Sequence, residues 1–225
     1  MTAAVALYRT SIGKKVMMAV TGCILFAYVV AHMYGNLKVF EGRDTFNAYA
    51  VFLRTVGAPL FAYGQLLWMV RVVILAAVIL HIVAATQLTR QSRASRPVRY
   101  AVKKNNGATY ASRTMRWGGL IIALFAIYHI LDLTTGTLHR DFVPGDVYHN
   151  VVTGFQVWYV STIYIAAMVA LGFHLYHGAW SMFHTLGISN RRIDRRLRAG
   201  AAVSAIAVVA AGCIVPIAVM IGIVG

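Results

Sequence analysis

Four histidines lie inside stretches of the sequence that are otherwise apolar, and each belongs to a different stretch. They are His32, His81, His129 and His174. A titratable ring is costly in lipid, so such residues usually face a partner inside a helix bundle. A neutral imidazole donates a lone pair to haem iron, and two histidines on opposite sides of the iron leave no open position. The four histidines therefore predict two bis-histidine haems b that transfer electrons rather than bind oxygen.

The apolar stretches are long enough to cross a bilayer, which takes about 20 residues in a helix. The chain has 225 residues, of which 60% are hydrophobic and only 12% are charged. A soluble protein of this length would need more charge to cover its surface. We therefore predict an all-α integral membrane protein that forms a single transmembrane domain, residues 1–225. Its five transmembrane helices are expected at 16–38, 62–88, 117–137, 155–183 and 200–224, and the first four form the haem-binding bundle.

The charged residues predict how the helices are oriented. If the spans are right, 16 of the 21 lysines and arginines fall on one side of the membrane, and five of the six acids fall on the other. The positive-inside rule then places the N-terminus in the cytoplasm. Because the basic residues sit at span ends, the net charge of +15 indicates contact with anionic lipid rather than nucleic acid. Cys23 and Cys213 lie in separate spans without a CxxC spacing, which argues against an iron–sulfur or zinc site in this chain.

Helical rise predicts how the four histidines pair by depth. His32 and His129 lie about 25 and 20 Å from the cytoplasmic edge, which places both in the outer half of the membrane. His81 lies about 14 Å from that edge, and His174 falls in the same inner half. We call His32 and His129 the outer pair, and His81 and His174 the inner pair. His177 follows His174 on roughly the same helix face. We take it as a partner of propionate or backbone, although the choice between the two for the fourth ligand stays open.

Other residues have roles that follow from these two sites. Haem propionates are anionic and favour arginine, so Arg113 and Arg116 are expected near the inner haem. Arg71 either serves the outer haem or extends to the interface. His139 and His149, in the outer loop, are expected to be solvated. Small residues either admit a flat macrocycle or serve helix packing; these are Thr21, Gly22, Gly118, Gly119 and Gly172.

Four stretches resemble the dihaem cytochrome b anchor of succinate:quinone oxidoreductases (respiratory complex II), the kind with five helices in one polypeptide. They are TGCILFAYVVAHMYGNL, RVVILAAVILHI, SRTMRWGGLIIALFAIYHI and FHLYHGAW, in that order. The resemblance covers nearly the whole chain and is weakest in the fifth span and the outer loops. It implies that the outer haem is held by His32 and His129, and the inner haem by His81 and His174.

The resemblance also implies partners and a location. A flavoprotein subunit would oxidise succinate or reduce fumarate, and an iron–sulfur subunit on the cytoplasmic face would pass electrons to this anchor. The chain would lie in the bacterial cytoplasmic membrane and use a quinone, menaquinone by resemblance. Some dihaem fumarate reductases place a Glu of the first outer loop near the quinone; here Glu41 follows His32 closely, Arg54 lies nearer the expected region, and Asp132 is an alternative outer acid. The oligomeric state is left open.

Two other classes of membrane protein compete with this interpretation. One is the cytochrome b of a formate dehydrogenase, a hydrogenase or a bc-type complex. In bc-type proteins two helices carry two histidines each, whereas each candidate here comes from its own helix. The other is a proton-coupled transporter with a histidine relay. It would favour acids and helix-breaking residues near mid-membrane, yet Pro216 is the only proline within a span. No nucleotide or flavin fingerprint is present, so we expect a subunit of an enzyme rather than an enzyme complete in one chain.

Overall fold

The computed structural model describes residues 8, 10–95 and 110–225, with the backbone alone for 110–113. Five helices are long and apolar enough to cross a membrane. They are α2 (Ser11–Leu37), α4 (Gln65–Ala94), α5 (Tyr110–Leu133), α7 (Trp158–Thr185) and α8 (Asp194–Met220). The shorter elements are η1 (Lys38–Glu41), α3 (Arg43–Thr55) and α6 (Val147–Gln156). The described residues contain no strand. The predicted all-α membrane fold with five spanning helices is confirmed.

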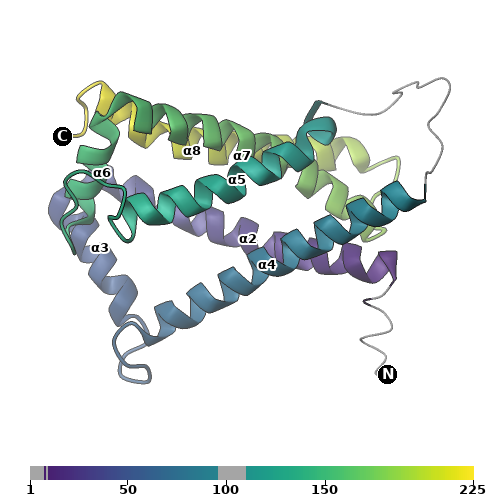
Figure 1. Ribbon diagram of the computed structural model, residues 1–225, viewed down its shortest axis with the longest axis horizontal. Coiled ribbons are helices and arrows are strands. Elements are labelled where there is room, and N and C mark those ends of the chain that lie inside the picture. The colour runs from purple at the N-terminus through teal and green to yellow at the C-terminus, as the bar shows by residue number, and fades with distance from the viewer. Residues whose placement is uncertain (1–7, 9, 96–109) are drawn as a thin grey trace.

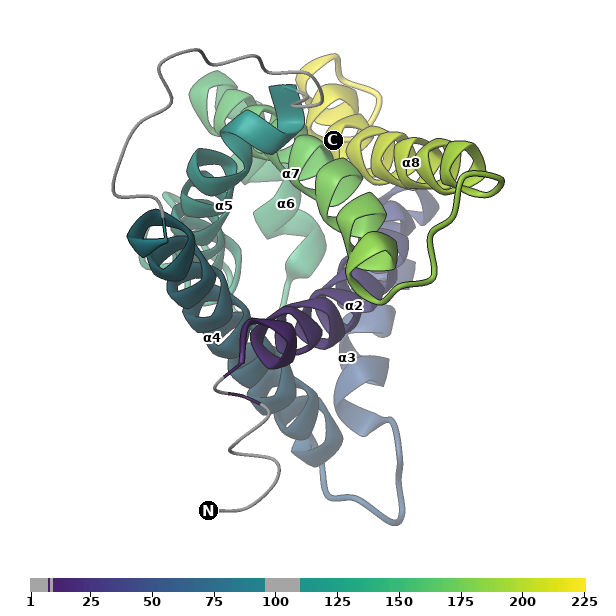
Figure 2. The ribbon, with the colours of Figure 1, turned by 90° about the vertical axis from the view of Figure 1, so that its right-hand side faces the viewer.

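The long helices pack in two couples, α2 with α4 and α5 with α7. α8 packs against α7 and, less extensively, against α2. Figure 1 shows that α2, α5 and α8 begin at the end of the bundle where α4 and α7 finish. The other end carries α3, α6 and the C-terminus; we call it the α3–α6 end and its opposite the basic end. Viewed from the basic end, α2, α4, α5 and α7 surround a common axis, and α8 lies outside them against α7 (Figure 2).

Close packing of α7 on α8 depends on two glycines. A Cβ atom at Gly172 would lie 2.4 Å from Cγ2 of Val209, and one at Gly212 would lie 2.6 Å from the sulfur of Met168. Small residues at such crossings let two membrane helices approach each other. Gly172, one of the small residues that either admit a macrocycle or pack helices, therefore packs helices.

Most large apolar side chains of α4 and α5 point outward. On α4 they include Trp68, Val72 and Leu75, each more than half exposed. Exposed apolar side chains on helices of this length suit contact with lipid tails. A buried apolar cluster lies instead at the α3–α6 end, where Phe46, Val152, Phe155 and Tyr164 pack with the last turns of α8.

The fourth span was predicted to begin at residue 155, and the structure has a break between two helices just after that residue. α6 ends at Gln156, and α7 begins at Trp158 after one extended residue, Val157. The buried Ser161 hydroxyl donates to the Phe155 carbonyl at 2.7 Å and holds this break. The third helix ends at Leu133 rather than at 137, because the chain then turns back through Gly136, whose φ is +72°.

Candidate functional site

The four histidines meet two by two across the bundle. The ring centroids of His32 and His129 are 5.6 Å apart with an interplanar angle of 83°. Those of His81 and His174 are 6.2 Å apart with an angle of 58°. Each pair joins one helix of the α2–α4 couple to one helix of the α5–α7 couple. The structure therefore brings together the same residues that helical rise paired by depth.

These separations fit a group whose metal lies between two imidazoles. With metal–nitrogen bonds of about 2.0–2.1 Å, two rings on opposite sides of one metal have centroids about 6 Å apart. Among the described residues, no group of three or more His, Cys, Asp or Glu side chains is arranged to hold a metal ion. A haem needs only the two axial ligands from the protein, because its macrocycle supplies the other four nitrogens. The residues present therefore fit haem better than a metal ion bound by the protein alone.

His177 stands apart from the inner pair. Its ring contacts Trp180 on the same helix, with centroids 6.0 Å apart. Its Nδ1, like that of His174, is buried and has no hydrogen-bond partner in the described part of the chain. Of the two candidates on α7, His174 is the one whose ring faces His81.

Small residues surround the inner pair. A Cβ atom at Gly22 would lie 3.5 Å from Cε1 of His81, and one at Gly119 would lie 3.6 Å from Cε1 of His174. Each ring of the pair thus faces a glycine on the helix packed against its own. Thr21 donates its hydroxyl proton to the Met17 carbonyl at 2.8 Å, and its oxygen lies 3.1 Å from Nδ1 of His81.

Since the Thr21 proton is already engaged by Met17, the Thr21 oxygen accepts the Nδ1 proton of His81. This assignment leaves the lone pair of Nε2 available to a metal.

Aromatic rings surround the outer pair. Tyr28, one turn before His32, stacks on it with centroids 5.5 Å apart and planes 13° from parallel. Phe125 packs beside His129 at 5.9 Å. The Arg71 guanidinium lies over the Trp68 ring at 4.9 Å and is near enough to Tyr28 to interact electrostatically. Arg71 therefore lies near the outer pair, as one of its two predicted roles requires.

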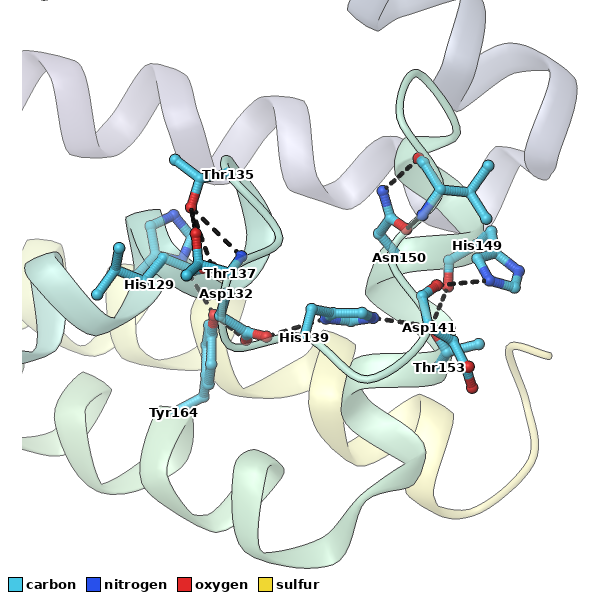
Figure 3. A network of polar contacts seen from close by, with 12 residues as sticks. His129, Asp132, Thr135, Thr137, His139, Asp141, His149, Asn150, Thr153 and Tyr164 are labelled. Carbon is cyan, nitrogen blue, oxygen red and sulfur yellow. Dashed lines mark hydrogen bonds and ion pairs between the residues drawn. The ribbon is translucent and has the colours of Figure 1, made fainter.

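A buried chain of hydrogen bonds leads away from the outer pair (Figure 3). Nδ1 of His129 lies 3.2 Å from the Tyr164 hydroxyl, which donates to Oδ2 of Asp132 at 2.8 Å. Oδ1 of Asp132 lies 2.9 Å from Nδ1 of His139, and the other ring nitrogen of His139 lies 3.1 Å from the Thr153 hydroxyl. The chain thus connects α5, α7, the turn after α5 and α6.

The prediction that His139 is a solvated loop residue is wrong. Its side chain is 2% exposed and pairs with Asp132, which is equally buried. The turn through Gly136 folds the loop back, so that the Leu138 amide donates to the Leu131 carbonyl and the imidazole lies against the end of α5. His149 is half-buried, and its Nε2 donates to the Asp141 carbonyl at 3.0 Å.

A cavity of about 240 Å³ lies beside these hydrogen bonds, at the α3–α6 end. Its lining includes both members of the buried pair, Asp132 and His139. The other polar lining residues are Arg140, Asp141, Thr153, Gln156 and Tyr159. The buried carboxylate of α5 is therefore close to a space that can hold water or a small polar group.

One ion pair and two hydrogen bonds of Asn47 connect α3 to α6. Asp146 accepts from the Arg43 guanidinium, from Nδ2 of Asn47 at 2.9 Å and from the His149 amide at 3.1 Å. Partial removal from water raises the pKa of the Asp146 carboxyl, but the three donors outweigh this effect and lower that pKa to about 2. The Asn47 side-chain oxygen also accepts from the Tyr148 amide, so Asn47 of α3 forms hydrogen bonds with two residues at the start of α6.

Four other residues were expected to have a role at the haems or at the quinone. Glu41 forms an exposed pair with Lys38 at 3.1 Å, and Arg54 donates to the Ala50 carbonyl of its own helix. Arg116 is exposed near the start of α5. The side chain of Arg113 lies outside the described residues.

The comparisons with known proteins give one match. A family model described as "Succinate dehydrogenase/Fumarate reductase transmembrane subunit" matches residues 89–214. This segment runs from the end of α4 into the last third of α8 and contains His129 and His174. No curated protein and no solved structure matches the chain.

Proposed function

Because the chain belongs to the family of succinate dehydrogenase/fumarate reductase transmembrane subunits, we propose that it is the cytochrome b anchor of such a complex. In this role it carries electrons between an iron–sulfur subunit and a membrane quinone through two haems b. The observation that supports this role is the meeting of four imidazoles in two pairs, at 5.6 and 6.2 Å, between different helices. The family covers both succinate oxidation and fumarate reduction, so the direction of electron flow is not part of the proposal.

The axial ligands in this proposal are His32 and His129 for the outer haem, and His81 and His174 for the inner haem. When bound between two imidazoles, haem supplies one-electron transfer at an iron with no open position. The chain contributes the orientation of the ligands. Hydroxyl oxygens accept the Nδ1 protons of His81 and His129, so the Nε2 lone pairs are free to coordinate.

The basic end is the end that we propose to face the cytoplasm and the other subunits. Of the described residues, Lys15, Arg90, Arg116 and the run of arginines from Arg191 to Arg198 lie there. Basic residues at span ends hold this orientation and attract anionic lipid. A flavoprotein and an iron–sulfur subunit would then dock on the side where the inner pair lies.

We place the quinone at the opposite, α3–α6 end, in the cavity that Asp132 and His139 line. Quinone carbonyl oxygens accept hydrogen bonds, and Arg140 and Gln156 in the lining are donors. A quinone analogue that carries a photoreactive group should label lining peptides from 138–141 or 153–160. Labelling confined to the basic end would place the quinone next to the inner pair instead.

The experiment that tests the proposed function is a difference spectrum of the purified chain, reduced minus oxidised. We expect a b-type band that accounts for two haems per chain. Absence of the band would favour the histidine-relay transporter. Purification of the intact complex should also yield a flavoprotein and an iron–sulfur subunit that oxidise succinate or reduce fumarate. A partner with formate dehydrogenase or hydrogenase activity would assign the chain to another quinone-linked complex.

A further inference from the structure

We infer that Tyr164 and Asp132 are positioning residues for His129, and that through it they set the reduction potential of the outer haem. The inference rests on the proposed function, because it concerns how the chain holds one of the proposed ligands. Neither residue takes part in the ligand pattern from which the function was argued. Both reach His129 through the hydrogen-bonded chain of Figure 3.

The number of available protons determines which group donates and which accepts in each of these hydrogen bonds. The Tyr164 hydroxyl has a single proton, and it lies 2.8 Å from a carboxylate oxygen of Asp132, which accepts it. The hydroxyl oxygen is then an acceptor towards Nδ1 of His129, at 3.2 Å. His129 is therefore held with its proton on Nδ1 and its lone pair on Nε2. If Tyr164 lacked an acceptor of its own, its proton could point at the imidazole and select the other tautomer.

The Tyr164 ring is held in place by its neighbours. Its centroid lies 4.9 Å from that of Phe125 and 4.8 Å from that of Phe155, both edge to face. The residue is only 6% exposed and belongs to the buried cluster at the α3–α6 end. Offset aromatic contacts of this kind restrict a ring to one orientation. The hydroxyl is thus kept between His129 and Asp132.

The Asp132 carboxylate fixes which groups donate, and it also brings a negative charge close to His129. Asp132 is 2% exposed, and its second oxygen receives a hydrogen bond from the equally buried His139. In such surroundings a hydrogen-bonded anion acts more strongly than in water. The Asp132 carboxylate polarises the Tyr164 hydroxyl, and the hydroxyl oxygen then attracts the Nδ1 proton of His129 more strongly. The His129 imidazole becomes a more basic ligand, which favours the oxidised state of a bound metal. Among the described residues, no carboxylate is linked in this way to His81 or His174.

The test compares variants of the intact complex by redox titration of its haem absorbance. Asp132→Asn keeps the shape of the side chain and removes the charge, and Tyr164→Phe removes the hydroxyl. In either variant we expect the ferric-to-ferrous ratio of the outer haem at a fixed potential to fall about tenfold. For a one-electron couple this equals a rise of about 59 mV in midpoint potential. The inner haem, titrated in the same sample, should not move, and the low-spin ferric resonance of the outer haem alone should change.

Tyr128→Phe is the matched control. Tyr128 packs against the Tyr164 ring at 6.1 Å, and in the described chain its hydroxyl has no hydrogen bond to His129 or Asp132. Equal potentials of the outer haem in the unaltered protein and in Tyr164→Phe would overturn the inference, and so would equal shifts in Tyr128→Phe and Tyr164→Phe. If Asp132→Asn does not assemble, the two tyrosine variants decide.

Loss of the outer haem from Tyr164→Phe but not from Tyr128→Phe supports the inference, and loss from both overturns it. An unaltered protein that binds no haem would instead refute the proposed function.

Discussion

The outer and inner pairs each consist of two imidazoles, but the residues around the two pairs differ. At the outer pair, the Nδ1 proton of His129 points to a hydroxyl that is itself bonded to a buried carboxylate, and the two rings are nearly perpendicular. At the inner pair, the Nδ1 proton of His81 meets the Thr21 hydroxyl, whose own proton goes to a backbone carbonyl. The outer pair is thus connected to charge, whereas the inner pair is defined by glycines and one neutral hydroxyl. The imidazoles themselves are alike, and the residues around them distinguish the two pairs from each other.

Removing a ligand is the strongest way to test this division. We expect His32→Ala or His129→Ala to abolish the outer haem and leave the inner haem largely intact, and His81→Ala or His174→Ala to do the reverse. A six-coordinate site that loses one of its two protein ligands no longer holds its haem in a defined orientation. Haem content per chain and a redox titration measure the result.

His177→Ala is the control for the inner pair, because its ring contacts Trp180 and not His81. This variant should keep both haems. If His177→Ala loses a haem while His174→Ala keeps two, the fourth ligand is His177 and the inner pair has been assigned wrongly.

The glycines beside the inner pair offer a smaller perturbation. A Cβ atom at Gly22 would make only ordinary contact with His81, at 3.5 Å, so Gly22→Ala should retain the inner haem. Gly22→Leu places a larger side chain beside the ring, and such overpacking costs about 1–3 kcal/mol. We expect inner haem occupancy to fall severalfold while outer occupancy stays the same. Gly200→Leu is the control, since nothing lies within 4 Å of a Cβ atom there. Equal loss of both haems from Gly22→Leu would mean that the bundle, and not the inner pair, was disturbed.

The pairing of the histidines could be predicted because long membrane helices are nearly rigid. Because the rise is about 1.5 Å per residue along a whole span, the depth of a residue in the membrane can be estimated from its distance in sequence to the span end. His139 could not be predicted in the same way. Its burial depends on the turn at Gly136, where a Cβ atom would lie 2.2 Å from Phe142, and no period in the sequence connects it to Asp132 and Thr153.

α6 was not predicted as a helix, for a related reason. The fourth span drawn from hydropathy begins at 155, so it joins the last two residues of α6 to α7. The break is made by a single extended residue and by the Ser161 hydroxyl that satisfies the Phe155 carbonyl. Interactions of one side chain with a nearby backbone group decide such breaks, and average hydropathy does not register them.

The smallest effect is expected at the connection between α3 and α6, which lies at the end of the bundle nearer the outer pair. The pKa of Asp146 is about 2 in the fold against 3.8 for an ordinary aspartate. A depressed pKa means that the carboxylate stabilises the folded state above about pH 4, and that this contribution is lost as pH falls from about 4 towards 2. Asp146→Asn should therefore lower the free energy of unfolding by about 1 kcal/mol at pH 7, because the pair with Arg43 is partly solvated.

Thermal unfolding in detergent at several pH values measures this difference, which should shrink as pH falls from about 4 and be lost below about pH 2. Asp141→Asn is the control, because in the described structure only its backbone carbonyl, and not its carboxylate, takes part in a hydrogen bond. Since Asp146 lies at the α3–α6 end, its loss should loosen the surroundings of the outer pair and leave the inner haem unchanged. A change in the inner haem alone would mean that the two halves are mechanically coupled through the long helices, and that the comparison between them holds for ligands but not for stability.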